Sequence, residues 1–273
     1  YIIDGLQRVT AAKRFLEEMP GDVHLGAVIH FDTDKKWERE RFRILNTTQS
    51  KVNVNVLLRN LREESPMLLT LYGLSFNTRE FPLYRRVCWS QNMKRNELVT
   101  AQTLVRVLAS LHIHKSSGII NMPIDSVKTA LDRLVRAVHL HPLRQNMLTF
   151  FTAIDECWDI RNIQYVYGAP YIRTAFLSVL ARVFSDHHDF WRGDDETQLV
   201  ISADLRRKLS IFPINDPQVS AIMGASGKAK ILLYAMLRDH INSGKRTKQI
   251  TPRRRLGDPE ETIKKIKELE PAG

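Results

Sequence analysis

The sequence contains little cysteine and no long apolar stretch. Its 273 residues include two cysteines, Cys88 and Cys157, which excludes a disulfide framework and a cysteine-rich zinc site. No apolar run is long enough to cross a bilayer, and the first residues lack the basic region of a signal peptide. Because thiols stay reduced in the cytosol, we expect a cytoplasmic protein. Because no apolar run can cross a bilayer, we expect no membrane partner.

An initiator methionine is also missing. The chain opens with Tyr1-Ile2-Ile3, which has the pattern of the end of a β-strand, and Asp4-Gly5 then signals a turn. We therefore expect part of the natural chain to lie upstream and the N-terminal domain to be incomplete.

Acidic residues are fewer than basic ones. Lysine and arginine number 41 against 30 aspartates and glutamates, so the formal net charge is +11. Hydrophobic residues make up 43% of the chain, which is ordinary for a globular protein and argues against disorder. The excess positive charge favours a polyanionic partner, with nucleic acid ahead of an anionic membrane surface.

The first part of the chain alternates between helix and strand patterns. A helical stripe ends at Pro20-Gly21, and apolar residues at every second position over 23–31 predict a half-buried strand. A charged helix is expected over 37–45, followed by a polar loop over 46–51. Asn53 is placed to cap the helix that follows.

From about Pro66 onward, strand patterns become scarce and helical spacing dominates. Helices are expected over 100–112, 125–140, 144–158, 170–185 and 229–241, with a short one capped by Ser202 and a weak last one over 263–269. The predicted class is α+β, with an α/β domain over 1–64, a mostly α-helical domain over 65–244 and a basic tail over 245–273.

The junction from strand to turn to helix at residues 2–8 is the most informative stretch. Such a junction directs backbone N–H groups and the helix dipole at an anion in the turn. Arg8 can donate two hydrogen bonds to a phosphate, and Gln7 can contact a base or a phosphate. Asp4 could orient Arg8, hold a metal ion or bind a ribose hydroxyl. Alternatively, Asp4 and Arg8 pair across the turn and only stabilise the loop.

Asp-Gly-Leu-Gln-Arg at residues 4–8 resembles the Asp-Gly-Gln-His/Gln-Arg signature of DGQHR-domain proteins. These proteins are similar to the ParB and sulfiredoxin N-terminal fold and include regulators linked to DNA phosphorothioation. A second motif, Phe-Arg-Ile-Leu-Asn-Thr-Thr-Gln-Ser-Lys-Val at residues 42–52, follows in the order and spacing of the family. The resemblance covers residues 1–61. Leu6 departs from it, because the family usually has glutamine there.

The resemblance implies a truncated ParB/sulfiredoxin-like domain with a phosphate- or nucleotide-binding loop. A nucleoside triphosphate with Mg²⁺ is the cofactor that it suggests. In an enzyme, Asp4 and Arg8 would be the catalytic residues. The phosphate-binding residues that it implies are Gly5, Gln7 and Arg8, faced by Asn46, Thr47, Thr48, Gln49 and Lys51.

Basic residues also cluster elsewhere, at Arg85-Arg86, Lys94-Arg95 and 206–208, and most densely at 245–255. The last segment contains no acidic residue, and a flexible basic segment contacts phosphates without base specificity. A solubilising tail is the alternative. The DNA-binding residues expected in this tail are Lys245, Arg246, Lys248, Arg253, Arg254 and Arg255.

Three other patterns carry less information. His187-His188-Asp189 could hold a metal, but no metal ligand set is assigned. The segment 224–228 lacks the first glycine of a phosphate-binding P-loop and fits the start of a helix instead. Both cysteines stand beside apolar residues, which is typical of inert buried thiols.

Three functions remain open from the sequence. The first is a DNA-associated binding or regulatory protein, in DNA modification, defence or mobile-element biology. The second is a ParB-like nucleotidase or a metal-dependent nuclease that uses the same loop. The third is a helical interaction scaffold in which the motif is only structural. Homo-oligomerisation is compatible with each of the three.

Overall fold

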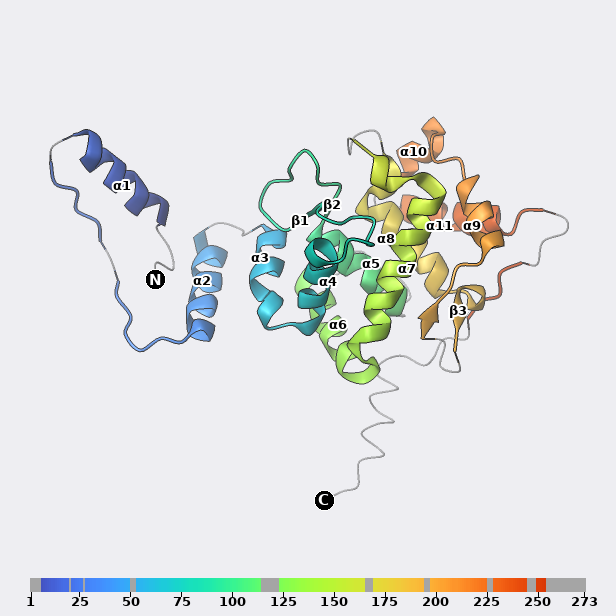
Figure 1. The fold of residues 1–273 in the computed structure, drawn as a ribbon, viewed down its shortest axis with the longest axis horizontal. Coiled ribbons are helices and arrows are strands. Elements are labelled where there is room, and N and C mark those ends of the chain that lie inside the picture. The colour runs from blue at the N-terminus through green and yellow to red at the C-terminus, as the bar shows by residue number, and fades with distance from the viewer. Residues whose placement is uncertain are drawn as a thin grey trace, which may run out of the picture.

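The computed structural model describes residues 6–19, 21–26, 28–49, 53–113, 123–164, 169–193, 197–224, 228–244 and 249–253. The described chain is mostly helical with a few two-residue strands, which agrees with the α+β class (Figure 1).

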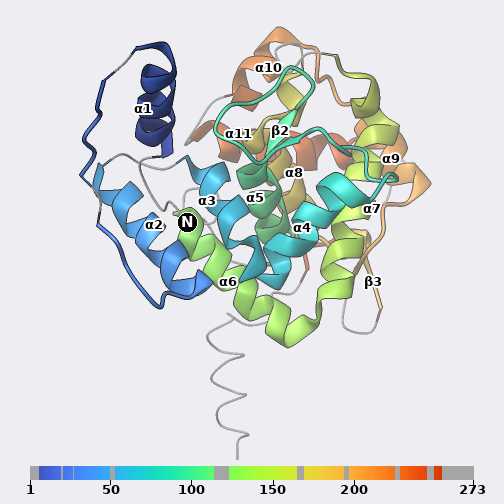
Figure 2. The same cartoon turned by 60° about the vertical axis from the view of Figure 1, so that its left-hand side comes forward.

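Two helices precede the main helical body. Helix α1 (Leu6–Glu18) ends before Pro20, as the sequence predicts. Helix α2 (Lys35–Gln49) begins after Asp34, whose carboxylate accepts a hydrogen bond from the Trp37 amide at 2.7 Å. An aspartate in this N-cap position satisfies one of the N–H groups that a helix start leaves open. In Figures 1 and 2, α1 and α2 lie beside the body rather than within it.

The predicted strand over 23–31 is wrong. Residues 23–26 and 28–31 form neither strand nor helix, and Val28, Ile29 and Phe31 are 84%, 71% and 82% exposed. A strand pattern becomes a strand only when a neighbouring strand pairs with its backbone and a second layer covers its apolar face. No strand within the described part of the chain pairs with this segment.

The loop predicted over 46–51 is also wrong in part. Asn46, Thr47, Thr48 and Gln49 form the last turn of α2 instead of a loop. Asparagine and threonine are weak helix formers, but neither stops a helix as glycine or proline does, and neither of those occurs between Lys35 and Gln49.

The helical body begins with α3 (Val54–Asn60), where Asn53 accepts a hydrogen bond from the Asn55 amide at 2.9 Å and caps the helix as predicted. The sequence did not predict α4 (Pro66–Asn77) and α10 (Pro217–Gly224), which each begin with a proline. The remaining helices are α5 (Ala101–His112), α6 (Ile124–Val138), α7 (Leu140–Trp158), α8 (Thr174–Ser185), α9 (Ala203–Ser210) and α11 (Lys228–Ile241), with short 3-10 helices η1 (Leu61–Glu63), η2 (Ile160–Asn162), η4 (Pro170–Ile172) and η5 (His188–Phe190).

Helix α5 is the centre of this body. All its residues are buried except Gln102 and His112, and its most extensive contact is with α8, which in turn packs against α11. Phe150 of α7 contacts Phe184 of α8 edge to face, with ring centroids 5.6 Å apart. Helix α3 packs on α5 through the buried Leu58, so residues 54–60 share the core of the helical body.

Short strand pairs join some of the helices. Strand β1 (Val87–Cys88) pairs in parallel with β2 (Val99–Thr100), which leads directly into α5. Strand β3 (Trp191–Arg192) pairs in antiparallel fashion with β4 (Gln198–Leu199). Each pair fixes a loop on the helical body, and neither forms a layer of its own.

Candidate anion-binding site

Helix α1 covers Leu6–Glu18, so a helix follows Asp4-Gly5 in the sequence as predicted, while the turn from which it would start stays a prediction. The first N–H groups of a helix have no partner within the helix and carry the positive end of its dipole. Gln7 and Arg8 belong to this first turn, and the Arg8 side chain is exposed. Asp4 and Gly5 lie outside the described residues, so their role stays a prediction.

The second half of the motif lies at the other end of a helix. The start of α1 is turned toward the end of α2 in both views, while the opposite ends of the two helices point apart (Figures 1 and 2). Asn46, Thr47, Thr48 and Gln49 occupy that end of α2, and Lys51 lies outside the described residues. The end of a helix presents carbonyl oxygens, so α2 could contribute to a phosphate site only through side chains.

An ion pair fastens α2 to the helical body. Arg39 pairs with Glu63 of η1, and the same guanidinium lies 3.5 Å from Glu64. On α2 itself, Trp37 has its ring 4.7 Å from that of His30 and 5.3 Å from the guanidinium of Arg41. The Arg39 and His30 contacts connect α2 to residues outside it, whereas the Trp37–Arg41 contact lies within the helix.

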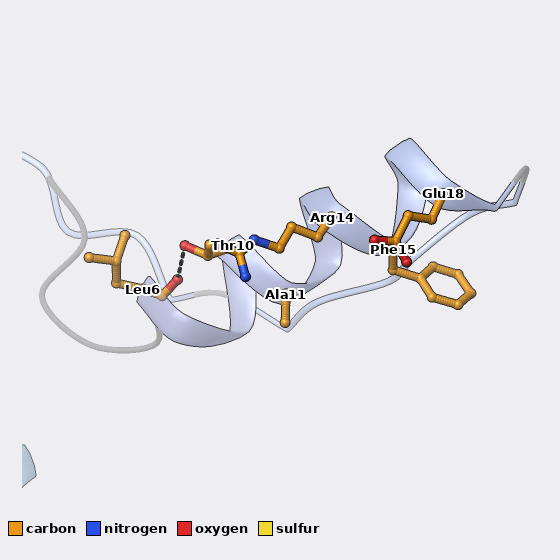
Figure 3. Close-up of a pocket in the computed structure, with 6 residues that line it drawn as sticks. All are labelled: Leu6, Thr10, Ala11, Arg14, Phe15 and Glu18. Atoms are coloured by element: carbon orange, nitrogen blue, oxygen red, sulfur yellow. Dashed lines mark hydrogen bonds between the residues drawn. The ribbon is translucent and has the colours of Figure 1, made fainter.

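A hollow of about 620 Å³ on α1 is not the expected phosphate site (Figure 3). Its lining residues all come from one face of this helix, so it has no opposite wall. That face mixes apolar Leu6 and Phe15 with the charged Arg14 and Glu18, and Thr10 donates to the Leu6 carbonyl at 2.8 Å. The hollow is an exposed helical face, and Arg8 is not among the residues that line it.

Several clustered cations have structural partners. Arg86 donates to the backbone carbonyls of Ile160, Arg161 and Ile163, and burial lowers its pKa. In the 206–208 cluster, Lys208 is buried and donates to the Ile241 carbonyl at 2.7 Å. The net charge of +11 therefore overstates how many cations are available to an external polyanion.

Part of the basic tail is held against the body. The Arg253 guanidinium lies over the Trp191 ring at 4.5 Å, and the Arg253 amide donates to the Asp186 carbonyl at 2.8 Å. The Thr251 amide donates to the Asp189 carboxylate at 2.6 Å. The expectation of a flexible segment is therefore wrong for residues 249–253. Lys245, Arg246, Lys248, Arg254 and Arg255 lie outside the described residues.

The described histidines and cysteines form no metal-binding cluster. Within the described ranges, no group of three or more His, Cys, Asp or Glu side chains is arranged to hold a metal ion. His187 is buried, and its Nδ1 lies 2.7 Å from the Val183 carbonyl oxygen. Both cysteines are free; Cys88 is buried, and desolvation raises the pKa of the half-buried Cys157 to about 11.

Comparison of the chain with protein-family models, curated proteins and solved structures gave no match. In the part of the chain that the structure describes, no helix combines the length and apolar character that a membrane span requires.

Two cations outside the predicted site influence each other in the helical body: burial lowers the pKa of Lys230, and the charge of Arg106 lowers it further. Arg106 is on the buried helix α5, and Lys230 is in the first turn of α11. The available signal was a basic residue in an otherwise apolar helical segment, Leu104 to Leu111.

Proposed function

We propose that this chain is a DNA-associated binding or regulatory protein that holds a phosphate group at the start of α1. The observation that carries the proposal is that the residues following Asp4-Gly5 in the sequence form helix α1, and that Arg8, near its first described residue, is exposed. A helix start supplies N–H donors and a positive dipole, and Arg8 adds a planar donor that suits a phosphate. The resemblance to DGQHR-domain and ParB-like proteins is the reason for proposing DNA and a ParB-like N-terminal domain.

The position of α2 supports the same proposal. Its last turn, with the Asn-Thr-Thr-Gln sequence of the second motif, is turned toward the start of α1 (Figure 2). The Arg39 ion pairs link the first half of α2 to Glu63 of η1 and to Glu64, and the Asn-Thr-Thr-Gln turn lies at the other end of this helix. A nucleotide or a DNA phosphate would then lie between the two helix ends, with Gln7 and Arg8 on one side.

Filter binding of the protein to duplex DNA over a series of salt concentrations tests the proposal. Contacts with phosphates release counterions, so the affinity should fall as a straight line in a plot of log affinity against log salt. Failure to bind DNA at low salt, or binding that does not depend on salt, would refute the proposal.

A further inference from the structure

The N-terminal part of the chain exposes a concentration of apolar side chains. Of the 14 large apolar side chains that are exposed among the described residues, eight lie within residues 6–31. Four of the eight belong to the short connection between α1 and α2, namely Leu25, Val28, Ile29 and Phe31. These exposures hold with α1, α2 and the helical body in place, so none of these elements covers the connection. Apolar side chains gathered in this way mark a surface that a partner covers.

The backbone of this connection lies open on the surface of the molecule. In residues 23–26 and 28–31, no backbone hydrogen bond is made to another part of the chain that the structure describes. The connection runs along the side of α1 and α2 that faces away from the helical body (Figures 1 and 2). Open N–H and C=O groups can pair with a strand of another chain. Asp32 has a φ of 55°, which a β-strand does not adopt, so a paired strand would end at Phe31.

The sequence of the connection has nearly the same pattern in both directions. Residues 22–32 read Asp-Val-His-Leu-Gly-Ala-Val-Ile-His-Phe-Asp, with an aspartate at each end, a histidine two positions further in and an apolar residue on both sides of each histidine. In an antiparallel pair of identical segments, Val23 therefore lies opposite Phe31 of the second copy, and Leu25 lies opposite Ile29. A two-fold axis produces each pair twice, and these apolar residues all fall on one face of the ribbon.

We propose that two copies of this chain associate through an antiparallel pairing of residues 23–31. The pairing satisfies the open backbone groups and buries apolar side chains of both copies. The exposed Phe15, Leu16 and Met19 of the adjoining α1 are available as the second apolar layer that a two-stranded ribbon needs for stability. A second copy fits better than an unrelated partner, because an identical segment matches this one pair by pair. The pairing does not use Arg8, so it does not depend on the proposed DNA binding.

Sedimentation equilibrium of the full chain at micromolar concentrations tests the pairing. The wild-type chain should form a dimer and no larger species, because a two-fold contact closes on itself. Ile29→Lys should weaken the dimer by about 100-fold, since the substitution places a charge in both halves of the apolar face. The control Ile231→Lys changes a comparably exposed isoleucine of α11 and should leave the dimer unchanged. Both side chains are exposed in the single chain, so neither substitution should unfold it.

Two complementary variants test which residues lie opposite each other. Leu25→Lys and Ile29→Glu should each be monomeric alone, whereas an equimolar mixture should form a heterodimer, because the introduced lysine then lies opposite the introduced glutamate. A monomeric wild-type chain, or an Ile29→Lys variant that dimerises as the wild type does, would overturn the proposal. A mixture that stays monomeric would overturn it as well, and so would an Ile231→Lys variant that loses the dimer to the same extent as Ile29→Lys.

Discussion

Arg86 Nη1 donates a hydrogen bond to the carbonyl oxygen of Ile160 at 2.9 Å. The same guanidinium also donates to the carbonyls of Arg161 and Ile163, so one side chain before β1 satisfies three acceptors in and just after η2. A planar guanidinium can serve several acceptors at once, which a lysine ammonium cannot do with the same geometry.

We predict that Arg86→Ala lowers the free energy of unfolding by about 2–3 kcal/mol, because hydrogen bonds from a charged donor are lost and the carbonyls stay partly buried. Urea titration followed by circular dichroism would measure the change. The neighbouring Arg85 is exposed, so Arg85→Ala should stay within about 0.5 kcal/mol of the wild type. Equal effects of the two substitutions would contradict a structural role for Arg86.

Lys208 gives a second prediction about a basic cluster. Its ammonium is buried and donates to the Ile241 carbonyl at the end of α11, whereas Arg207 is 76% exposed and pairs with Asp204. Lys208→Ala should therefore cost about 2 kcal/mol of stability, and Arg207→Ala less than about 0.5 kcal/mol. Thermal unfolding of the two variants would measure both values. A Lys208→Ala protein as stable as the wild type would show that the buried contact contributes nothing.

The Cys157 thiol should be unreactive at neutral pH. Desolvation and the neighbouring Glu156 raise its pKa from 9.0 to about 11, against a smaller opposite effect of Arg206. Since the thiolate is the nucleophile, Cys157 at pH 7.5 should react with a disulfide reagent about 100-fold more slowly than an unperturbed thiol. The rate should still rise about tenfold per pH unit between pH 8 and 10.

The Cys88→Ala variant isolates this reaction, and the doubly substituted Cys88→Ala, Cys157→Ala protein provides the blank. Raising the folded-state pKa also means that the unfolded chain loses the proton first, so this thiol should reduce stability as the pH rises from about 9 to 11. A rate that levels off near pH 9 would contradict the raised pKa.

The sequence predicted the parts of the fold that have a local signal. Helix α5 was predicted from its apolar stripe over 100–112, and the structure adds a cap in which the Thr103 amide donates to the Thr100 hydroxyl at 3.3 Å. Helix α4 escaped detection because it is apolar on most sides, which removes the contrast that marks a helix. The strand predicted over 23–31 is absent for a different reason. An alternating apolar pattern is a property of the segment itself, whereas a strand also needs a partner strand from elsewhere in the chain.

Only the parts of the site whose residues lie close together in the sequence could be predicted. The helix that follows Asp4-Gly5 in the sequence is such a case, because its signal lies within one short stretch. The structural use of Arg86 and Lys208 could not be predicted, because their acceptors are backbone carbonyls far away in the sequence. The same reason hides the electrostatic effect of Arg106 on Lys230, since the two residues belong to different helices.

The central claim is that Arg8 at the start of α1 contacts a phosphate of DNA. The most direct measurement is the slope of log affinity against log salt for duplex DNA, compared between the wild type, Arg8→Ala and the control Arg14→Ala, a second exposed arginine of α1. Arg8→Ala should weaken binding and make the slope shallower by about 0.9, which corresponds to one phosphate contact, while Arg14→Ala should leave the slope unchanged. Identical slopes for the wild type and Arg8→Ala would contradict the claim.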